Sequence, residues 1–129
     1  MITCSARLRP DVGFIAFFAS VSGAFGNRGQ IDYSAANDAL DKLAWWLSSR
    51  LAGKVVSLDW GPWGGAGMIS AELAREYERR GVGLIDPVLG AESFLDELLH
   101  GGAAPQVVLM NAPLAVMDGR PGAAVAEGE

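Results

Sequence analysis

Two serines, a tyrosine and an asparagine lie close together in the sequence and could jointly protonate a carbonyl oxygen. Ser20 and Ser22 close an apolar run, whereas Tyr33 and Asn37 stand four residues apart where a helical pattern begins. At that spacing both side chains project from one face of a helix. A serine hydroxyl can position a carbonyl oxygen while a phenol donates a proton to it. These residues therefore favour a reaction in which a carbonyl oxygen gains a proton.

The same residues also have plainer interpretations. A tyrosine and an asparagine in a first helical turn are most often an exposed aromatic and a polar surface residue. Ser20 could simply cap a loop amide, and Ser22 competes with it for the positioning role. A free phenol is a poor proton donor at neutral pH without a nearby cation, and no lysine follows Tyr33 by four residues. A hydrolase is disfavoured, because Ala19–Gly23 lacks the first glycine of a nucleophile elbow.

Three segments have the pattern of buried strands. Gly13–Ser20 is continuously apolar, as expected for a strand that is covered on both faces of a parallel sheet. Lys54–Trp60 is short and rich in β-branched residues, and the Gly-Pro pair after it must end the strand. Gln106–Met110 is the third strand. From Asn111 onward the chain is rich in Ala, Gly and Pro and aperiodic, which predicts a frayed tail.

A first helix is predicted from Asp32, after an irregular glycine-rich loop over residues 21–30. Gly53 is a suitable residue to end it. Its apolar positions recur at helical spacing and predict the buried face. They are Ala36, Leu40, Leu43, Ala44, Leu47 and Leu51.

Two more helices follow the second strand. Ser70 is a good N-cap for a strongly charged helix over residues 71–80, which we expect at the surface or as a flap. Asp86 followed by Pro87 is a typical helix start, and the glycines from Gly101 end that helix. Its predicted buried face consists of Leu89, Phe94, Leu95, Leu98 and Leu99.

The alternation of strands and helices predicts the fold class. Strand–helix–strand order indicates right-handed crossovers, hence an α/β fold with a parallel sheet and flanking helices. The glycine-containing loops over residues 21–30 and 61–67 then leave their strands at the same edge of the sheet. Ligands of such sheets bind beyond the carboxyl ends of the strands. The candidate residues and both loops therefore converge on one predicted site.

Composition narrows the class of protein. The 129 residues are enough for one domain with a core, and 50% hydrophobic residues exclude wholesale disorder. A net charge of -5 argues against nucleic acid as the main partner. The apolar run over residues 12–19 is too short to span a membrane. A single cysteine, Cys4, and the absence of a secretory signal pattern predict a reducing, cytoplasmic location.

Two segments together resemble a known family. Phe17–Asn37 reads FFASVSGAFGNRGQIDYSAAN, and Val56–Trp63 reads VSLDWGPW. Both are similar to the active-site strand, loop and helix start, and to the following cofactor-side loop, of ketoreductase domains from modular polyketide and polyunsaturated-fatty-acid synthases. These domains are short-chain dehydrogenase/reductases. The resemblance extends roughly over residues 12–110 and implies a partial Rossmann-like sheet, the C-terminal half of a short-chain reductase fold.

The resemblance implies a role for each matching residue. Ser20 would orient the β-keto oxygen, Tyr33 would be the general acid, and Asn37 would hold the proton-relay geometry at a position where other short-chain reductases have lysine. The implied cofactor is NADPH, with its nicotinamide near Gly61, Pro62 and Trp63. The residues expected near the substrate are Phe25, Gln30 and Met68. No metal site is expected.

The implied reaction is reduction of a β-ketoacyl thioester to the β-hydroxyacyl form. The substrate would be carried by an acyl carrier protein, and neighbouring synthase domains would be partners. Phe25 stands where a tryptophan marks one stereochemical class, so the sequence leaves the stereochemical course open.

The sequence also departs from the family pattern. No G-x-G-x-x-G follows an early strand, and Lys42 and Lys54 are the only lysines, whereas the family's catalytic lysine comes from upstream of the matching run. Residues 1–11 match nothing in the resemblance, which suggests a late-started reading frame, and residues 113–129 are expected to be a disordered tail. The alternative function is therefore a truncated, non-catalytic fragment or structural piece that packs against a partner and does not bind nucleotide alone. The first strand would then have an open apolar edge, which predicts poor solubility or oligomers.

Overall fold

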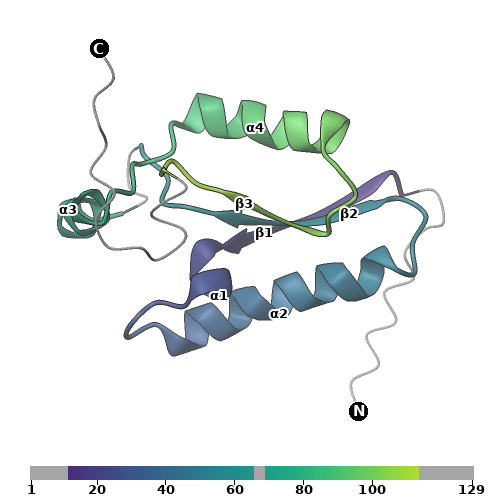
Figure 1. Cartoon of the computed structure of the whole chain (residues 1–129), viewed down its shortest axis with the longest axis horizontal. Coiled ribbons are helices and arrows are strands. Elements are labelled where there is room, and N and C mark those ends of the chain that lie inside the picture. The colour runs from purple at the N-terminus through teal and green to yellow at the C-terminus, as the bar shows by residue number, and fades with distance from the viewer. Residues whose placement is uncertain (1–11, 66–68, 114–129) are drawn as a thin grey trace.

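Three parallel strands form the middle layer of the structure, with a long helix on each side of the sheet (Figure 1). The computed structural model describes residues 12–65 and 69–113. The strands are β1 (Phe14–Ser20), β2 (Lys54–Trp60) and β3 (Gln106–Leu109), hydrogen-bonded in the order β1-β2-β3. The α/β fold with a parallel sheet that the sequence predicts is confirmed.

The helices occupy two different kinds of position. α2 (Ile31–Ser48) covers one face of the sheet and α4 (Pro87–His100) covers the other (Figure 1). The short α1 (Val21–Phe25) follows β1 directly, and α3 (Ala71–Arg79) lies beyond one end of the sheet. Within the part of the chain that the structure describes, no helix is both long and apolar enough to cross a membrane.

The strand register brings the ends of β1 and β2 together. Phe14 pairs with Lys54 at the start of the two strands, and Ser20 pairs with Trp60 at their carboxyl ends. Leu109 of β3 ends beside Trp60 as well. Because all three strands end at the same edge, α1 and the loop after β2 both leave from that edge, as the positions of the glycine loops predict.

The two faces of the sheet differ in chemistry because side chains alternate along β2. Val56, Leu58 and Trp60 face α4 and form the apolar core with Ile85. Burying a side chain such as Leu58, which has no exposed surface, contributes about 1.5–3 kcal/mol. The side chains between them belong to the other face and contact α2, where Ser57 hydrogen-bonds to a residue of that helix.

The predicted caps of α3 and α4 are confirmed. The Leu73 amide donates to the Ser70 hydroxyl oxygen at 3.2 Å. The Val88 amide donates to Asp86 Oδ1 at 2.9 Å, and proline occupies the first turn of α4. Each cap satisfies amides that a helix start leaves without a partner, which stabilises the helix by about 1 kcal/mol.

The predicted irregular loop over residues 21–30 is wrong in its first half. Residues Val21–Phe25 form α1, because the Ser20 side chain caps this turn by accepting from the Ser22 amide. Gly23 permits the arrangement, since a Cβ there would lie 2.9 Å from Asn37 Cβ and 2.8 Å from the Asp38 amide nitrogen. A five-residue helix is too short to show a period in the sequence.

The predicted buried face of α2 is partly wrong. Ala36 and Leu43 are exposed, whereas Asn37 and Asp41 are buried together with Ala44. The buried residues are spaced by four and three, so the helix contacts the sheet along a stripe that hydropathy alone assigns to solvent.

The helix also ends earlier than expected, at Ser48 rather than near Gly53. The amides of Arg50 and Leu51 both donate to the Leu47 carbonyl and close the last turn. Gly53 is needed instead because the backbone at Val12 passes close to it. A Cβ at position 53 would lie 2.7 Å from the Val12 carbonyl oxygen.

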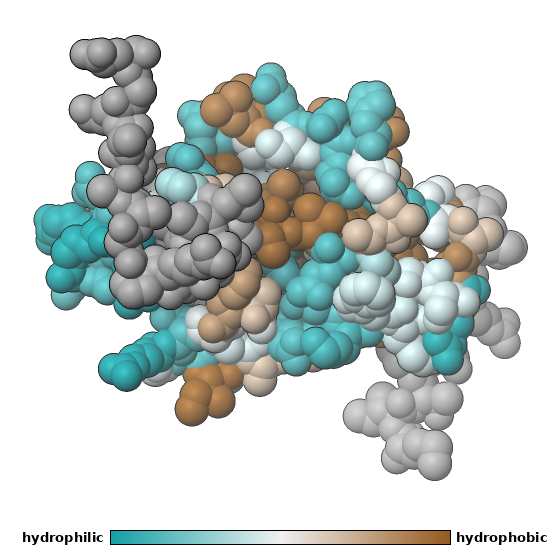
Figure 2. All heavy atoms as spheres, viewed as in Figure 1, coloured by the Kyte–Doolittle hydropathy of each residue, from teal (hydrophilic) through white to brown (hydrophobic). Residues whose placement is uncertain are grey.

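The predicted face of α4 is also only partly buried. Phe94 and Leu98 pack against the core, but Leu89, Leu95 and Leu99 are more than half exposed. The helix contacts the sheet along the row that includes Gly90, where a Cβ would lie within 2.4 Å of the Trp63 ring. Figure 2 shows hydrophobic surface on the outside of α4 and in the band between α4 and α2.

Asn111 is not the start of a frayed tail. Its carbonyl accepts from the Gly83 amide at 2.8 Å, and its side-chain amide donates to the Leu84 carbonyl at 3.1 Å. These bonds tie the end of β3 to the segment between α3 and α4. The rest of the predicted tail, from residue 114 onward, lies outside the described residues.

Candidate active site

A cavity of about 330 Å³ opens at the carboxyl edge of β1 and β2, next to α3. This volume is near the lower end of the range for small-molecule sites. Its lining comes from β1, the α1 and α2 starts, the loop after β2, and α3. The lining residues are Phe18, Ala19, Ser20, Ser22, Gln30, Tyr33, Trp60, Gly61, Pro62, Trp63, Ile69, Leu73 and Tyr77. The sequence-predicted edge is therefore where the cavity lies.

Ser20 is fixed at the end of β1 by its role as the cap of α1. The Ser22 amide donates to Ser20 Oγ at 3.2 Å, and the residue is only 9% exposed. A hydroxyl has two acceptor lone pairs and one hydrogen to donate. The cap uses one lone pair, so the hydroxyl hydrogen remains for a carbonyl oxygen placed in the cavity.

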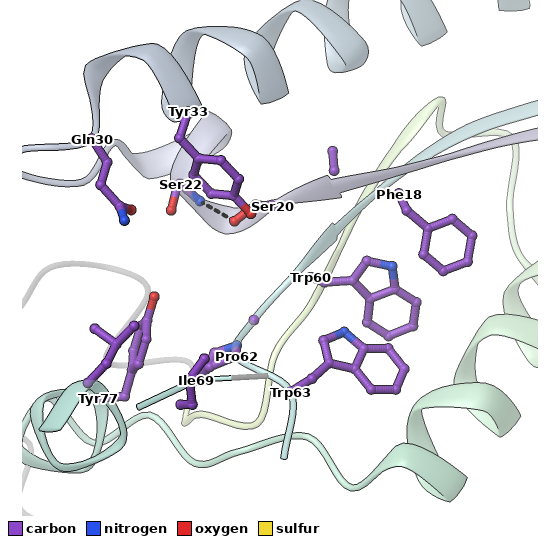
Figure 3. A pocket seen from close by; sticks show the side chains of 13 residues that line it. Phe18, Ser20, Ser22, Gln30, Tyr33, Trp60, Pro62, Trp63, Ile69 and Tyr77 are labelled. Carbon is purple, nitrogen blue, oxygen red and sulfur yellow. Dashed lines mark hydrogen bonds between the residues drawn. The ribbon is translucent and has the colours of Figure 1, made fainter. Parts of the chain in front are cut away.

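Tyr33 lies in the first turn of α2 and its side chain reaches the same cavity. Figure 3 shows its ring extending from the helix toward the Ser20 hydroxyl. The residue is 51% exposed. The two hydroxyls expected to act on one carbonyl oxygen therefore line the same cavity, although they come from different elements.

Asn37 lies one turn further along α2 and does not line the cavity. Its side-chain Nδ2 donates to the Tyr33 carbonyl oxygen at 2.8 Å, and the residue is 7% exposed. This bond fixes the backbone of the turn that carries Tyr33. The relay role implied by the resemblance stays a prediction.

The loop after β2 is held rigidly by its own backbone bonds. The Gly61 amide donates to the Leu109 carbonyl, and the Pro62 carbonyl accepts from the Ile85 amide, each at 2.8 Å. Trp63 pairs with Ile85 in a parallel bridge whose hydrogen bonds are made by the residues before and after Trp63. The N–H and C=O of Trp63 itself therefore point away from Ile85. Of the three predicted cofactor-side residues, Trp63 is the one whose backbone groups these bonds leave available.

The three residues predicted near the substrate lie in different places. Gln30 lines the cavity, and Asn27 donates to its side-chain oxygen at 2.8 Å. Phe25 is 56% exposed at the end of α1 and is not part of the lining. Met68 lies outside the described residues.

The sequence predicts the helix over residues 71–80 at the surface or as a flap, but it does not identify the residues that line the cavity. Ile69, Leu73 and Tyr77 line the side opposite Tyr33, and Figure 3 shows the Tyr77 phenol directed into the space. Leu73 and Tyr77 are four residues apart on a helix whose other positions are mostly charged. That apolar pair was the available signal, because two apolar residues on one face of a charged helix favour contact with another part of the chain.

The lining suits an uncharged reactive group. Aromatic and aliphatic side chains surround four hydroxyls and one side-chain amide, and none of the described lining residues is charged. A nicotinamide ring and a ketone fit this chemistry, whereas the phosphates of a dinucleotide would require donors outside the cavity. Among residues 12–65 and 69–113 there is also no group of three or more side chains that could hold a metal ion.

Fold and cavity thus define an α/β domain whose chemistry lies at the carboxyl edge of a parallel sheet. The model of the KR domain family matches residues 4–81, more than half of the chain. The chain belongs to this family, and the resemblance to ketoreductase domains is confirmed. The match begins inside the segment 1–11 that showed no resemblance by itself. KR domains are nicotinamide-dependent reductases.

Relatives and solved structures agree with this assignment. The chain is 34% identical over 102 residues to one of the proteins that make up the polyunsaturated fatty acid synthase of Thraustochytrium sp., a match over 79% of this chain and 4% of that protein. It is 35% identical over 103 residues to polyketide synthase GfsA of Streptomyces halstedii, over 79% of this chain and 1% of that protein.

The fold is similar to that of PlmKR1, the ketoreductase of the first module of phoslactomycin biosynthesis in Streptomyces sp. HK803. The TM-score is 0.74 with 29% identity, over 91% of this chain and 28% of that one. The chain therefore spans only a small part of the length of the proteins that it matches.

Proposed function

We propose that this chain forms the catalytic edge of an NADPH-dependent ketoreductase that reduces a β-ketoacyl thioester to the β-hydroxyacyl form. The supporting observation is the meeting of Ser20 and Tyr33 at one uncharged cavity beyond the carboxyl ends of β1 and β2. The substrate would be an acyl chain on a carrier protein, within a polyketide or polyunsaturated-fatty-acid synthase. Neighbouring synthase domains would be its partners, and the cytoplasm its location.

The proposed chemistry adds a hydride to the keto carbon and a proton to the keto oxygen. When bound, NADPH would supply the hydride and leave as NADP⁺. The Ser20 hydroxyl would donate a hydrogen bond to the keto oxygen and hold it in place. As negative charge develops on that oxygen, the Tyr33 hydroxyl would transfer its proton to it. The product is a secondary alcohol.

The surrounding residues would support this step in two ways. Phe18, Trp60 and the α3 side chains would exclude water from the reacting carbon, which strengthens the hydrogen bonds to the oxygen. The Asn37 bond to the Tyr33 carbonyl would fix the turn that carries the phenol. The nicotinamide would lie against the loop after β2, with the Trp63 backbone as its hydrogen-bonding partner.

A chimera tests the proposal. Residues 12–113 would replace the corresponding segment of the phoslactomycin ketoreductase, the structural match with TM-score 0.74. We expect NADPH oxidation that depends on a β-ketoacyl thioester and yields the hydroxy product. A folded chimera that binds NADPH but produces no hydroxyacyl product, alongside an active parent, would contradict the proposal. It would favour the non-catalytic alternative.

A further inference from the structure

Two aspartates are buried between α2 and the sheet, and the proposed reaction does not use them. Asp41 lies on α2 and Asp59 on β2, and neither residue has any exposed surface. Figure 1 shows α2 lying along this face of the sheet. Ionised carboxylates are almost never fully buried unless a cation or several donors accompany them.

Each carboxyl group has a partner for only one of its oxygens. The Ser57 hydroxyl donates to Asp41 Oδ1 at 2.7 Å, and the Gln106 side chain donates to Asp59 Oδ2 at 2.8 Å. The remaining oxygens, Asp41 Oδ2 and Asp59 Oδ1, are buried and have no partner among the described residues. Asp59 follows Ser57, the partner of Asp41, by two residues on the same face of β2, so both carboxyl groups lie in the same layer between α2 and the sheet.

No described cation can complete this pair. Lys42 is the nearest basic residue on α2, but it binds Asp38 at 2.7 Å and its side chain is 69% exposed. β1 places the uncharged Ala19 opposite Asp59, and β3 contributes the neutral Gln106. Asp38 itself adds further negative charge nearby. Two ionised carboxylates can only accept hydrogen bonds, whereas a single proton would let one carboxyl group donate to the other.

We infer that Asp41 and Asp59 share one proton in the folded protein, and that this proton clamps α2 to β2. Burial, followed by the hydrogen bond and charge of Asp41, raises the pKa of Asp59 from 3.8 to about 7, although the Gln106 bond opposes the shift. The clamp is therefore closed in mildly acidic solution and opens as the proton leaves near neutral pH.

On α2, the clamp lies about two helical turns from Tyr33. Asp41 follows Asn37 by four residues, and Asn37 in turn donates to the carbonyl of Tyr33. Asp41 and Asp59 are thus positioning residues, since they touch no reacting atom. Their effect on Tyr33 rests on the proposed function, whereas the shared proton itself does not.

The sign of the pH dependence follows from the raised pKa. The folded state binds the proton between about pH 4 and pH 7 while the unfolded chain does not, so stability falls as pH rises through this interval. Between pH 6 and pH 8 one such group changes the folded-to-unfolded ratio by about tenfold. An Asp59→Asn side chain would donate to Asp41 permanently and keep its acceptor for Gln106.

Thermal and denaturant unfolding of this chain at pH 6 and pH 8 test the inference, together with infrared spectra of the carboxyl region. We expect the wild type to lose about tenfold in the folding ratio and to show a protonated-carboxyl band at pH 6 that disappears by pH 8. Asp59→Asn should lose both features and be the more stable protein at pH 8. Glu92→Gln, which changes an exposed carboxyl on α4, should behave as the wild type does.

Asp41→Asn is a second variant that tests the shared proton, because it too places an amide donor between the two side chains. An unchanged pH dependence in Asp59→Asn, or no protonated-carboxyl band in the wild type, would overturn the inference. So would failure of both asparagine variants to fold, because each is an isosteric copy of the protonated state. None of these results depends on whether the protein is a reductase.

Discussion

The Ser22 amide donates to the Ser20 hydroxyl oxygen at 3.2 Å, so a single contact both starts α1 and orients the proposed substrate-binding hydroxyl. Structure and chemistry are therefore linked at Ser20, and the two serines are not equivalent. Ser22 contributes its backbone amide to this contact, whereas Ser20 contributes its side chain.

Substitution at the two serines should separate their roles. Ser20→Ala in the chimera should lower kcat/KM about 100-fold, because one donor to the developing oxyanion is lost. It should also destabilise the fold by about 1 kcal/mol through loss of the cap. Ser22→Ala keeps its amide and should retain most of the activity. A larger loss in Ser22→Ala than in Ser20→Ala, measured under the same conditions, would assign the roles the other way.

The buried amide of Asn37 should matter for stability as well as for positioning. Asn37→Ala removes the donor to the Tyr33 carbonyl and leaves a space between α1, α2 and the sheet. We expect a loss of about 1–3 kcal/mol in the free energy of unfolding. Denaturant unfolding measures this, with Asn27→Ala at a half-buried position as the control. Equal midpoints for the two variants would show that the buried bond contributes nothing.

The α3 wall should determine how well the acyl chain binds. Tyr77→Ala enlarges the cavity on the side opposite Tyr33, so KM for the acyl thioester should rise several-fold while kcat changes little. The unfolding temperature should hardly change, because α3 has no buried residue. Glu72→Ala on the same helix is the matched control. A fall in kcat with constant KM would instead place Tyr77 in the chemical step.

An ion pair joins the start of β2 to the C-terminal end of α4 and should stabilise the packing of that helix. Lys54 Nζ at the start of β2 donates to the Glu97 carboxylate at 2.9 Å and also to the Gly102 carbonyl at 3.3 Å. Both side chains are mostly buried. Lys54→Met should therefore cost about 1–3 kcal/mol, and a double-mutant cycle with Glu97→Gln should recover part of it. Additive effects in the cycle would mean that the pair has no interaction energy.

The exposed edge of the sheet should make the isolated chain associate. Among the described residues β1 pairs only with β2, and Phe14 on β1 is 51% exposed. Sedimentation should therefore show association that increases with concentration and decreases in Phe14→Lys, which puts a charge on the edge. A wild-type chain that stays monomeric at every concentration would rule this out.

Sequence reasoning succeeded where local chemistry decides the structure. The caps at Ser70 and Asp86, the end of β2 before Gly61-Pro62, and the meeting of the glycine loops at one edge follow from short-range rules. Ser20 and Tyr33 could be placed at one site for the same reason.

Sequence reasoning failed where the surface that a helix packs against determines which of its residues are buried. Hydropathy assigns the polar positions of α2 to solvent, but β2 presents Ser57 and Asp59 to that helix, so Asn37 and Asp41 are buried. The α3 wall depends in the same way on where a distant helix lies beyond the end of the sheet. Such pairings require knowledge of both surfaces, and a single helix pattern contains only one of them.

The role of Tyr33 as proton donor is tested most directly by the rate of ketone reduction by Tyr33→Phe in the chimera, measured beside NADPH binding. We expect a loss of about 100-fold or more in kcat, because the proton donor is gone, with NADPH affinity unchanged. A Tyr33→Phe protein that reduces the β-ketoacyl thioester at close to the wild-type rate would contradict this role.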